Sequence, residues 1–230
     1  MNVGLNIAAA GMLAEQVRQD QLSNDLANAS TPGYKPQTSV QSSFGALLLA
    51  NTATGQQIGS MQTGTDISKI VTDTAPAPLQ QTGQPLDFAI AGDGFFAVRT
   101  PQGVRYTRDG QFSSSAQGAL VDADGDEVLG QNGAPIGVSA KGTVPASALG
   151  VFNIKGAQEQ GDNLFTGSAA GRATGSVEQG ALEGSGVDAI QTMTEMIASL
   201  QAYQSGQQAI QTIAQTLQAS STNVGAVGGP

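Results

Sequence analysis

A helix-like stripe that stops at a rigid turn constrains this chain more than any other sequence feature. Side chains spaced alternately three and four residues apart lie on one face of an α-helix. Such a series opens the chain, with two polar members: Leu5, Ala8, Met12, Glu15, Gln19, Leu22 and Leu26. Asn28 is suited to a left-handed helix cap, and Thr31-Pro32-Gly33-Tyr34 has Pro and Gly in the order of a type II turn. We therefore predict a long N-terminal helix that ends near Asn28 and is followed by a tight turn.

A second series with the same spacing runs along the C-terminal region. Its members are apolar except for one glutamine: Met193, Met196, Leu200, Tyr203, Gln207, Ile210, Ala214 and Leu217. Spacings of three and four throughout are the heptad pattern of a coiled coil. The two narrow stripes predict that the terminal helices pack on each other or on other copies of the chain.

The predicted C-terminal helix carries almost no charge. Between Val187 and Ala219 the charged residues are Asp188 and Glu195, and glutamine is frequent. Solvated helices usually form ion pairs one turn apart, so this pattern favours a helix enclosed by other protein. A simple bias towards Ala and Gln is the alternative. Gly206 weakens the helix by about 1 kcal/mol relative to Ala, and it either admits a neighbouring helix or is a neutral weak point.

The hydrophobic period changes to two in the middle of the chain. Leu86, Phe88 and Ile90 alternate with Asp87 and Ala89, as in a half-buried strand. Further apolar runs and turn signals follow, including an Asp109-Gly110 hairpin signal and short strands expected at Val138, Val144 and Leu149–Ile154. We predict an antiparallel all-β domain over residues 85–184, between terminal helical regions 1–35 and 185–225, which makes the fold α+β. Residues 36–84, which contain Ala-Pro-Ala-Pro, are expected to form an extended connector.

Composition argues against several classes of function. The 230 residues include 9 Lys+Arg and 18 Asp+Glu, and the formal net charge of -9 argues against nucleic-acid binding. The absence of Cys and His removes thiol nucleophiles, the usual zinc ligands and the commonest general base. The acidic run Asp122-Ala-Asp124-Gly-Asp126 lacks the Gly and Glu positions of a calcium loop and fits a hairpin turn better. We expect no enzyme activity, no metal and no cofactor.

No apolar run approaches the ~20 residues of a membrane span. The mildly apolar stretch Val3–Ala14 is not preceded by Lys or Arg, and its amphipathic pattern continues through Leu26. We therefore expect neither membrane insertion nor a cleaved signal peptide.

Three blocks of this sequence resemble the flagellar hook and basal-body rod protein family. The N-terminal signature is matched by Leu26–Lys35 (LANASTPGYK), the shared β domain by Pro85–Phe96 and Tyr106–Phe112, and the C-terminal signature by Gly180–Asp188 followed by Met193–Tyr203. Two positions depart from the family's pattern. Asp25 replaces an Asn of the N-terminal signature, and Gly186 stands where the family usually has Asn.

The resemblance implies a structural subunit of the bacterial flagellar basal-body rod. The terminal helices would form an inner coiled-coil layer, and the β domain an outer layer, of a helical assembly that transmits torque from motor to hook. The implied partners are other copies of the chain, other rod and hook subunits and the flagellar export apparatus, with export from the cytoplasm through the flagellum's own type III channel. Hook proteins are usually much longer, and the simplest proximal rod subunits lack the β block. A distal rod subunit is therefore the first choice and a related minor rod subunit the second.

The residues assigned to the assembly interface lie on the two stripes and beside the turn: Leu5, Ala8, Met12, Leu22, Asn24, Leu26, Asn28, Met193, Met196, Leu200, Tyr203, Gln207, Ile210 and Leu217. Asn24 and Asn28 either hydrogen-bond across helices in the assembly or cap the first helix. Thr31, Pro32, Gly33 and Tyr34 form the family's signature turn, in which Tyr34 is expected to be a packing residue. The alternative from another class is a secreted, oligomeric β-domain binding module, which would require an aromatic or polar cleft in residues 85–182.

Overall fold

The computed structural model describes residues 3–43, 47–50, 57–61, 65–139, 142–161 and 163–226. Three stretches of the predicted connector, residues 44–46, 51–56 and 62–64, lie outside these ranges. The chain divides into two compact units. The first, called the helical unit, comprises Met1–Asn24, Thr38–Val71 and Ile190–Pro230, and the second, called the β unit, comprises Asp25–Gln37 and Thr72–Ala189.

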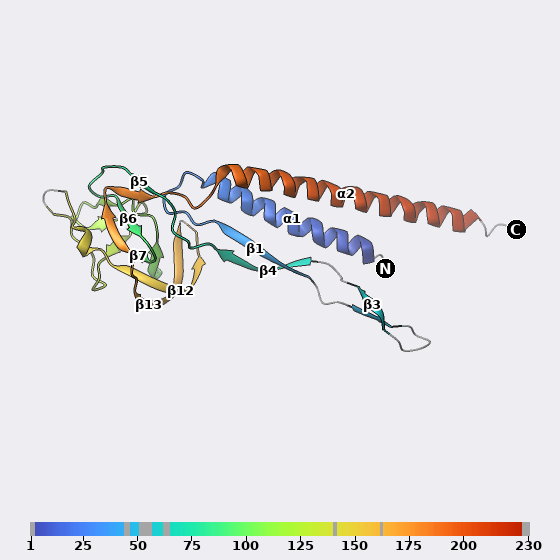
Figure 1. Cartoon of the computed structure of the whole chain (residues 1–230), viewed down its shortest axis with the longest axis horizontal. Coiled ribbons are helices and arrows are strands. Elements are labelled where there is room, and N and C mark those ends of the chain that lie inside the picture. The colour runs from blue at the N-terminus through green and yellow to red at the C-terminus, as the bar shows by residue number, and fades with distance from the viewer. Residues whose placement is uncertain are drawn as a thin grey trace. The chain divides into compact units, whose positions relative to one another are not determined.

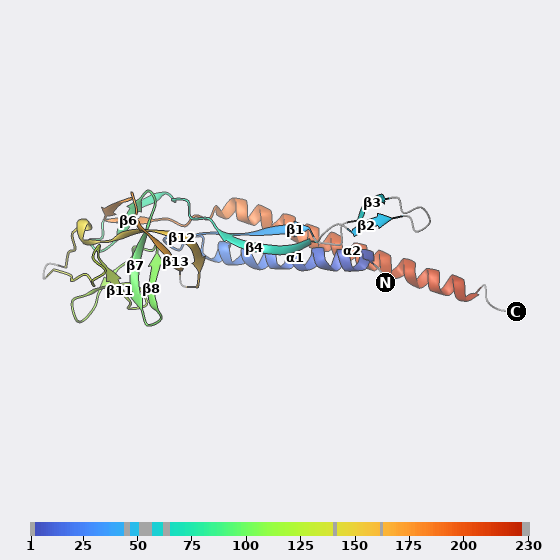
Figure 2. The same cartoon turned by 90° about the horizontal axis from the view of Figure 1, so that it is seen from below.

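Two long helices dominate the helical unit. α1 spans Val3–Ala27 and α2 spans Ala189–Ala226, and the two lie side by side in both views (Figures 1 and 2). Four strands accompany them: β1 (Gln37–Ser43) pairs with β4 (Thr65–Thr72), and β2 (Leu47–Ala50) pairs antiparallel with β3 (Gln57–Met61). Both predicted helices are confirmed. No helix in the described part of the chain is long and apolar enough to cross a membrane.

The end of α1 differs from the predicted cap. Asn28 is not left-handed, because Asn163 (φ 56) is the one non-glycine residue with positive φ in the described ranges. The N–H groups of Asn28 and Ala29 instead donate to the carbonyl oxygens of Asp25 and Leu26, three residues earlier, at 3.1 and 3.2 Å. The helix therefore closes with a tightened last turn, which satisfies these groups without a left-handed residue.

The turn that follows α1 has the predicted type II geometry. Gly33, at the third position, has φ +66, which that turn requires and which favours glycine. The Tyr34 N–H donates to the Thr31 carbonyl at 3.4 Å and closes the turn. Pro32 fixes the second position.

Short antiparallel strands form most of the β unit, as the alternating pattern predicted. Their bounds are β5 (Leu79–Gln81), β6 (Phe88–Ala91), β7 (Phe95–Thr100), β8 (Gly103–Thr107), β9 (Ser113–Ser114), β10 (Leu120–Val121), β11 (Glu127–Leu129), β12 (Val151–Glu159), β13 (Leu164–Arg172), β14 (Ser176–Gln179) and β15 (Ala181–Glu183), with a 3-10 turn η1 at Ala146–Ala148. Seven strands form one sheet in the order β12-β13-β8-β7-β11-β10-β9, and β12 also pairs with β7. The strands β12, β13, β8 and β7 therefore close into a ring. Separate two-stranded sheets pair β14 with β6 and β15 with β5.

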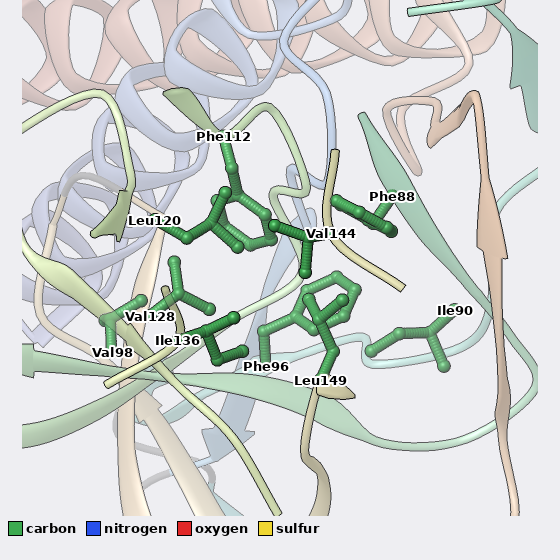
Figure 3. Close-up of a cluster of buried hydrophobic side chains, with 10 residues drawn as sticks. All are labelled: Phe88, Ile90, Phe96, Val98, Phe112, Leu120, Val128, Ile136, Val144 and Leu149. Atoms are coloured by element: carbon green, nitrogen blue, oxygen red, sulfur yellow. The ribbon is translucent and has the colours of Figure 1, made fainter. Parts of the chain in front are cut away.

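β7 separates two hydrophobic clusters. Phe96 and Val98 point into the larger cluster, and Phe95 and Ala97 point into the smaller one, as alternate residues of a strand must. Figure 3 shows the larger cluster, which consists of Phe88, Ile90, Phe96, Val98, Phe112, Leu120, Val128, Ile136, Val144 and Leu149. Most of this core is aliphatic, so a chain with few aromatic residues still forms a buried hydrophobic core.

The Asp109-Gly110 hairpin prediction is wrong. β8 pairs with β7 and β13, whereas β9 pairs with β10, so the strands on either side of this dipeptide are not partners. The Gly110 carbonyl instead accepts from the Phe88 N–H at 3.0 Å, and a Cβ on Gly110 would overlap the Phe88 backbone. Val138 and Val144 also lie outside strands, although Val144 is buried. The conformation and contacts of Gly110 are therefore determined by its packing against β6 and not by the local turn preference of Asp-Gly.

Candidate functional site

The signature turn lies directly on the β domain. A Cβ on Gly33 would come within 2.5 Å of the carbonyl carbon of Arg108 and the nitrogen of Asp109. The Gly33 N–H donates to the backbone carbonyl of Glu183 at 2.9 Å. The contact therefore excludes any side chain here, in addition to the preference that positive φ imposes.

A buried hydrogen bond joins the two sides of this turn. The Tyr34 hydroxyl donates to Asp25 Oδ1 at 2.7 Å, and the Gln37 N–H donates to the same oxygen at 3.4 Å. Burial raises the pKa of the Tyr34 phenol, and the bond to Asp25 raises it further, so the hydroxyl remains a donor at neutral pH. A carboxylate accepts more strongly than the amide oxygen of the Asn that the family usually has, so Asp25 suits this position. The last turn of α1 is thus attached to the segment beyond the turn.

Three charged side chains, here called the junction cluster, are buried together beside the turn: Lys35, Arg108 and Glu183. Glu183 Oε1 accepts from Lys35 Nζ at 2.6 Å, and Oε2 accepts from Arg108 Nη1 at 2.8 Å. None of the three side chains is more than 1% exposed. The Ala77 N–H also donates to Glu183 Oε1 at 2.8 Å, and Lys35 Nζ donates to the Ala75 carbonyl at 2.6 Å. Burial lowers the pKa of Lys35, and the Glu183 carboxylate opposes that shift.

Small and polar residues of α2 lie where it approaches α1. Ser199 Oγ donates to Glu15 Oε2 at 2.7 Å, and a Cβ on Gly206 would lie 2.9 Å from Met12 Cγ. Ala8 and Met12 line a groove of about 440 Å³ between the two helices. Gly206 therefore admits the neighbouring helix, which was the first of its two predicted roles.

Large apolar side chains of α2 lie on another face. Ile190, Met193, Ile197 and Leu200, here called the outer stripe, are spaced three and four residues apart. Ile190 is 80% exposed, Ile197 58% and Leu200 45%. A row of exposed apolar residues is unusual on a helix that faces water and is typical of a contact surface.

The remaining residues predicted for the interface have mixed environments. Leu22 is buried, Leu5, Ala8, Met12, Leu26, Asn28, Met196, Tyr203 and Ile210 are half-buried, and Asn24, Gln207 and Leu217 are exposed. Asn28 Oδ1 accepts from Thr31 Oγ1 at 3.1 Å, which fits a local role at the helix end. The contacts of these residues with other subunits remain predictions.

A hollow in the β unit offers little support for a binding module. Its volume is about 270 Å³, below the ~300–1,000 Å³ of most ligand sites. Its lining has no aromatic residue, and its polar side chains Gln131 and Arg172 hydrogen-bond to each other. The lining residues are Gln131, Ala146, Ser147, Leu149, Val151, Arg172, Ala173, Gly175 and Val177. The aromatic residues of this domain pack inside it instead, as the 5.3 Å separation of the Phe96 and Phe112 rings shows.

Three family profiles match the chain in the predicted order. They are described as "Flagella basal body rod protein" at residues 5–35, "Flagellar hook protein FlgE/F/G D1 domain" at 89–155 and "Flagellar basal body rod FlgEFG protein C-terminal" at 178–223. The flagellar basal-body rod proteins FlgG of Bacillus subtilis and Caulobacter vibrioides are each 32% identical to it, over 91% and 94% of this chain and 94% and 97% of theirs. The chain belongs to the flagellar hook and basal-body rod protein family. The rod protein FlgF of Rhizobium meliloti is 30% identical over 88% of this chain and 90% of its own.

The junction cluster joins the three segments that define this family. Lys35 lies in the rod segment, Arg108 in the D1 segment and Glu183 in the C-terminal segment. The sequence analysis assigned these residues no role. The one sequence feature that could have indicated them is that each of the three family-like blocks contains one of these charged residues.

Gly186, the second departure from the family's pattern, also lies at this junction. Its N–H donates to the Tyr34 carbonyl at 2.9 Å, and a Cβ would lie 2.9 Å from Pro36 Cδ. The Asn that the family usually has at this position would therefore require Pro36 to move.

Replacing Tyr34 with phenylalanine should lower the free energy of unfolding by about 1–2 kcal/mol, because Asp25 then loses the hydrogen bond from the Tyr34 hydroxyl while remaining buried. Urea unfolding of the purified chain would measure this loss. Tyr203→Phe, which changes a tyrosine on α2, is the matched control. Equal unfolding midpoints for the two variants would show that the Tyr34–Asp25 bond does not stabilise the junction.

Proposed function

We propose that this chain is a structural subunit of the flagellar basal-body rod, located in the basal body and without enzymatic activity. The observation that carries this proposal is similarity to rod proteins along nearly the whole chain, both terminal helices included. An enzyme or a small binding module would have no need for two long helices with exposed apolar residues.

The outer stripe is the proposed contact with other subunits. Its four side chains are each at least 45% exposed, and burying one leucine contributes about 1.5–3 kcal/mol. A stripe that meets a different face of the next subunit forms a head-to-tail contact, and such contacts build open helical filaments when they do not close into a ring. In this proposal α1 and α2 form the inner coiled-coil layer of the rod.

The charge pattern of α2 supports an enclosed helix. After Glu195, which pairs with Arg18 at 3.5 Å, the helix has no charged residue. Charges enclosed by other helices would be costly unless paired, whereas amides and small side chains are tolerated. Helices interlocked in this way would transmit torque from the motor to the hook. Other copies of the chain, other rod and hook subunits and the export apparatus are the proposed partners.

We favour the distal rod, since the β domain separates this chain from the simplest rod subunits of the family. A minor rod subunit is the second candidate, favoured by the FlgF proteins among the relatives, which match over a similar share of the chain.

The test is to delete the gene and to locate a tagged, functional copy. We expect the deletion to stop swimming and filament formation, and the tagged chain to purify with basal bodies. Copy number relative to the hook protein would separate the two candidates, because a major rod subunit must be present in many copies. Normal rods in the deletion strain, with the protein found elsewhere, would refute a role in the rod. Complementation with the unaltered gene is the control.

A further inference from the structure

Glu183 receives hydrogen bonds from three other parts of the β unit. Its carboxylate accepts from Lys35, Ala77 and Arg108, and its backbone carbonyl accepts from the Gly33 N–H. These donors belong to the segment after α1, the segment before β5 and the residue that follows β8. Glu183 itself ends β15, a few residues before α2 begins.

We propose that Glu183 locks the segments on either side of the β domain, so that residues 33–37 and 181–186 dock together or not at all. The Tyr34–Asp25 bond extends this lock to the last turn of α1, and the bond from the Gly186 N–H to the Tyr34 carbonyl extends it towards the start of α2. One buried carboxylate thereby fixes both the segment that follows α1 and the segment that precedes α2 within the β unit. The proposal does not depend on what the helices contact, and it therefore goes beyond the proposed function.

The contacts of the junction cluster make the docking mutually dependent. Two buried cations, Lys35 and Arg108, share the one carboxylate of Glu183. When residues 181–186 leave, both cations lose their counter-charge, and a buried charge without its partner is strongly unfavourable. When residues 33–37 leave, Glu183 keeps Arg108 but loses the hydrogen bonds from Lys35 and Gly33, and Gly186 loses its acceptor on Tyr34. The departure of one segment therefore promotes the departure of the other.

Amide hydrogen exchange on the full-length chain tests this coupling. In Glu183→Gln, which keeps the shape of the side chain but removes its charge, the amides of Gly33, Ala77 and Gly186 should exchange roughly 100-fold faster or more. The Leu120 amide, which donates to Ile136 in the β core at 2.8 Å, should keep its protection. Glu178→Gln, an exposed glutamate on β14, is the control and should change none of these amides.

Lys35→Met provides a second and independent variant. The Gly184 N–H donates to the Pro78 carbonyl at 2.9 Å and bonds neither Lys35 nor a residue next to it. Faster exchange at Gly184 as well as at Gly186 would therefore show that loss of the Lys35 contact releases residues 181–186. The proposal is overturned if Lys35→Met accelerates only the amides next to residue 35. It is also overturned if Leu120 accelerates by the same factor as Gly186 in both variants, because the whole β unit would then open as one body.

Discussion

Replacing Leu200 with lysine should abolish rod assembly and swimming while leaving the melting temperature of the free subunit unchanged. Leu200 is 45% exposed in the outer stripe, so the folded chain loses little when the side chain changes. In the proposed rod the same position is enclosed by other helices, where a leucine contributes about 1.5–3 kcal/mol. Lysine would forfeit part of this and bury an ammonium group without a carboxylate.

The carboxylate nearest to Leu200 along α2 cannot compensate. Glu195 pairs with Arg18 and lies five residues away, which is off the Leu200 face of the helix. Because every subunit would carry the substitution, the cost would recur at each addition to the growing rod.

Leu200→Met is the matched control, since it keeps an apolar side chain of similar size and should assemble. Basal bodies purified from cells that contain only the variant, together with motility assays, would measure the effect. Normal rods with Leu200→Lys would exclude the outer stripe as a subunit contact. A lower melting temperature of the free Leu200→Lys chain would instead mean that this residue packs within its own subunit.

Replacing Gly33 with alanine should destabilise the β unit by about 3 kcal/mol or more, a large fraction of the usual 5–15 kcal/mol stability of a domain. Positive φ accounts for roughly 1–2 kcal/mol of this. The remainder arises because the new methyl group would come within 2.5 Å of the Arg108 and Asp109 backbone, which cannot rotate away as a side chain could.

Gly83→Ala separates the two causes. Gly83 has φ +71, close to the +66 of Gly33, but a Cβ there meets no described atom within 4 Å. Chemical denaturation of both variants should therefore show a clearly larger loss for Gly33→Ala than for Gly83→Ala. Equal losses would mean that the signature glycine is required for its turn alone and not for contact with the β domain.

Local sequence patterns predicted the elements of this fold better than their contacts. The stripe from Leu5 to Leu26 predicted α1, and the Pro32-Gly33 order predicted its turn, because both depend on short-range backbone preferences. The role of Gly206 beside α1 was one of two predicted for it, but the contact of Ser199 with Glu15 escaped prediction. Hydrophobic periodicity selects large residues such as Leu200, whereas close approach of two helices requires small ones such as Ser199 and Gly206.

The junction cluster was missed for a different reason. Lysine, arginine and glutamate are mostly exposed in proteins, so a sequence gives no reason to bury Lys35, Arg108 or Glu183. Their burial depends on pairing between residues 148 positions apart, and no local pattern carries that information. The Asp109-Gly110 prediction was wrong for a similar reason. The contacts of Gly110 are determined by β6, which is not adjacent to it in the sequence.

The bond between Lys35 and Glu183 also has a consequence for how the protein matures. Translation produces the N-terminal signature early, but its buried counter-charge lies 148 residues later. During synthesis Lys35 therefore stays hydrated, and the segment after α1 cannot form its buried ion pair until nearly the whole chain has been made. The contacts that Glu183 makes are accordingly among the last to form, and a chain cut short before residue 183 would lack the counter-charge of both Lys35 and Arg108.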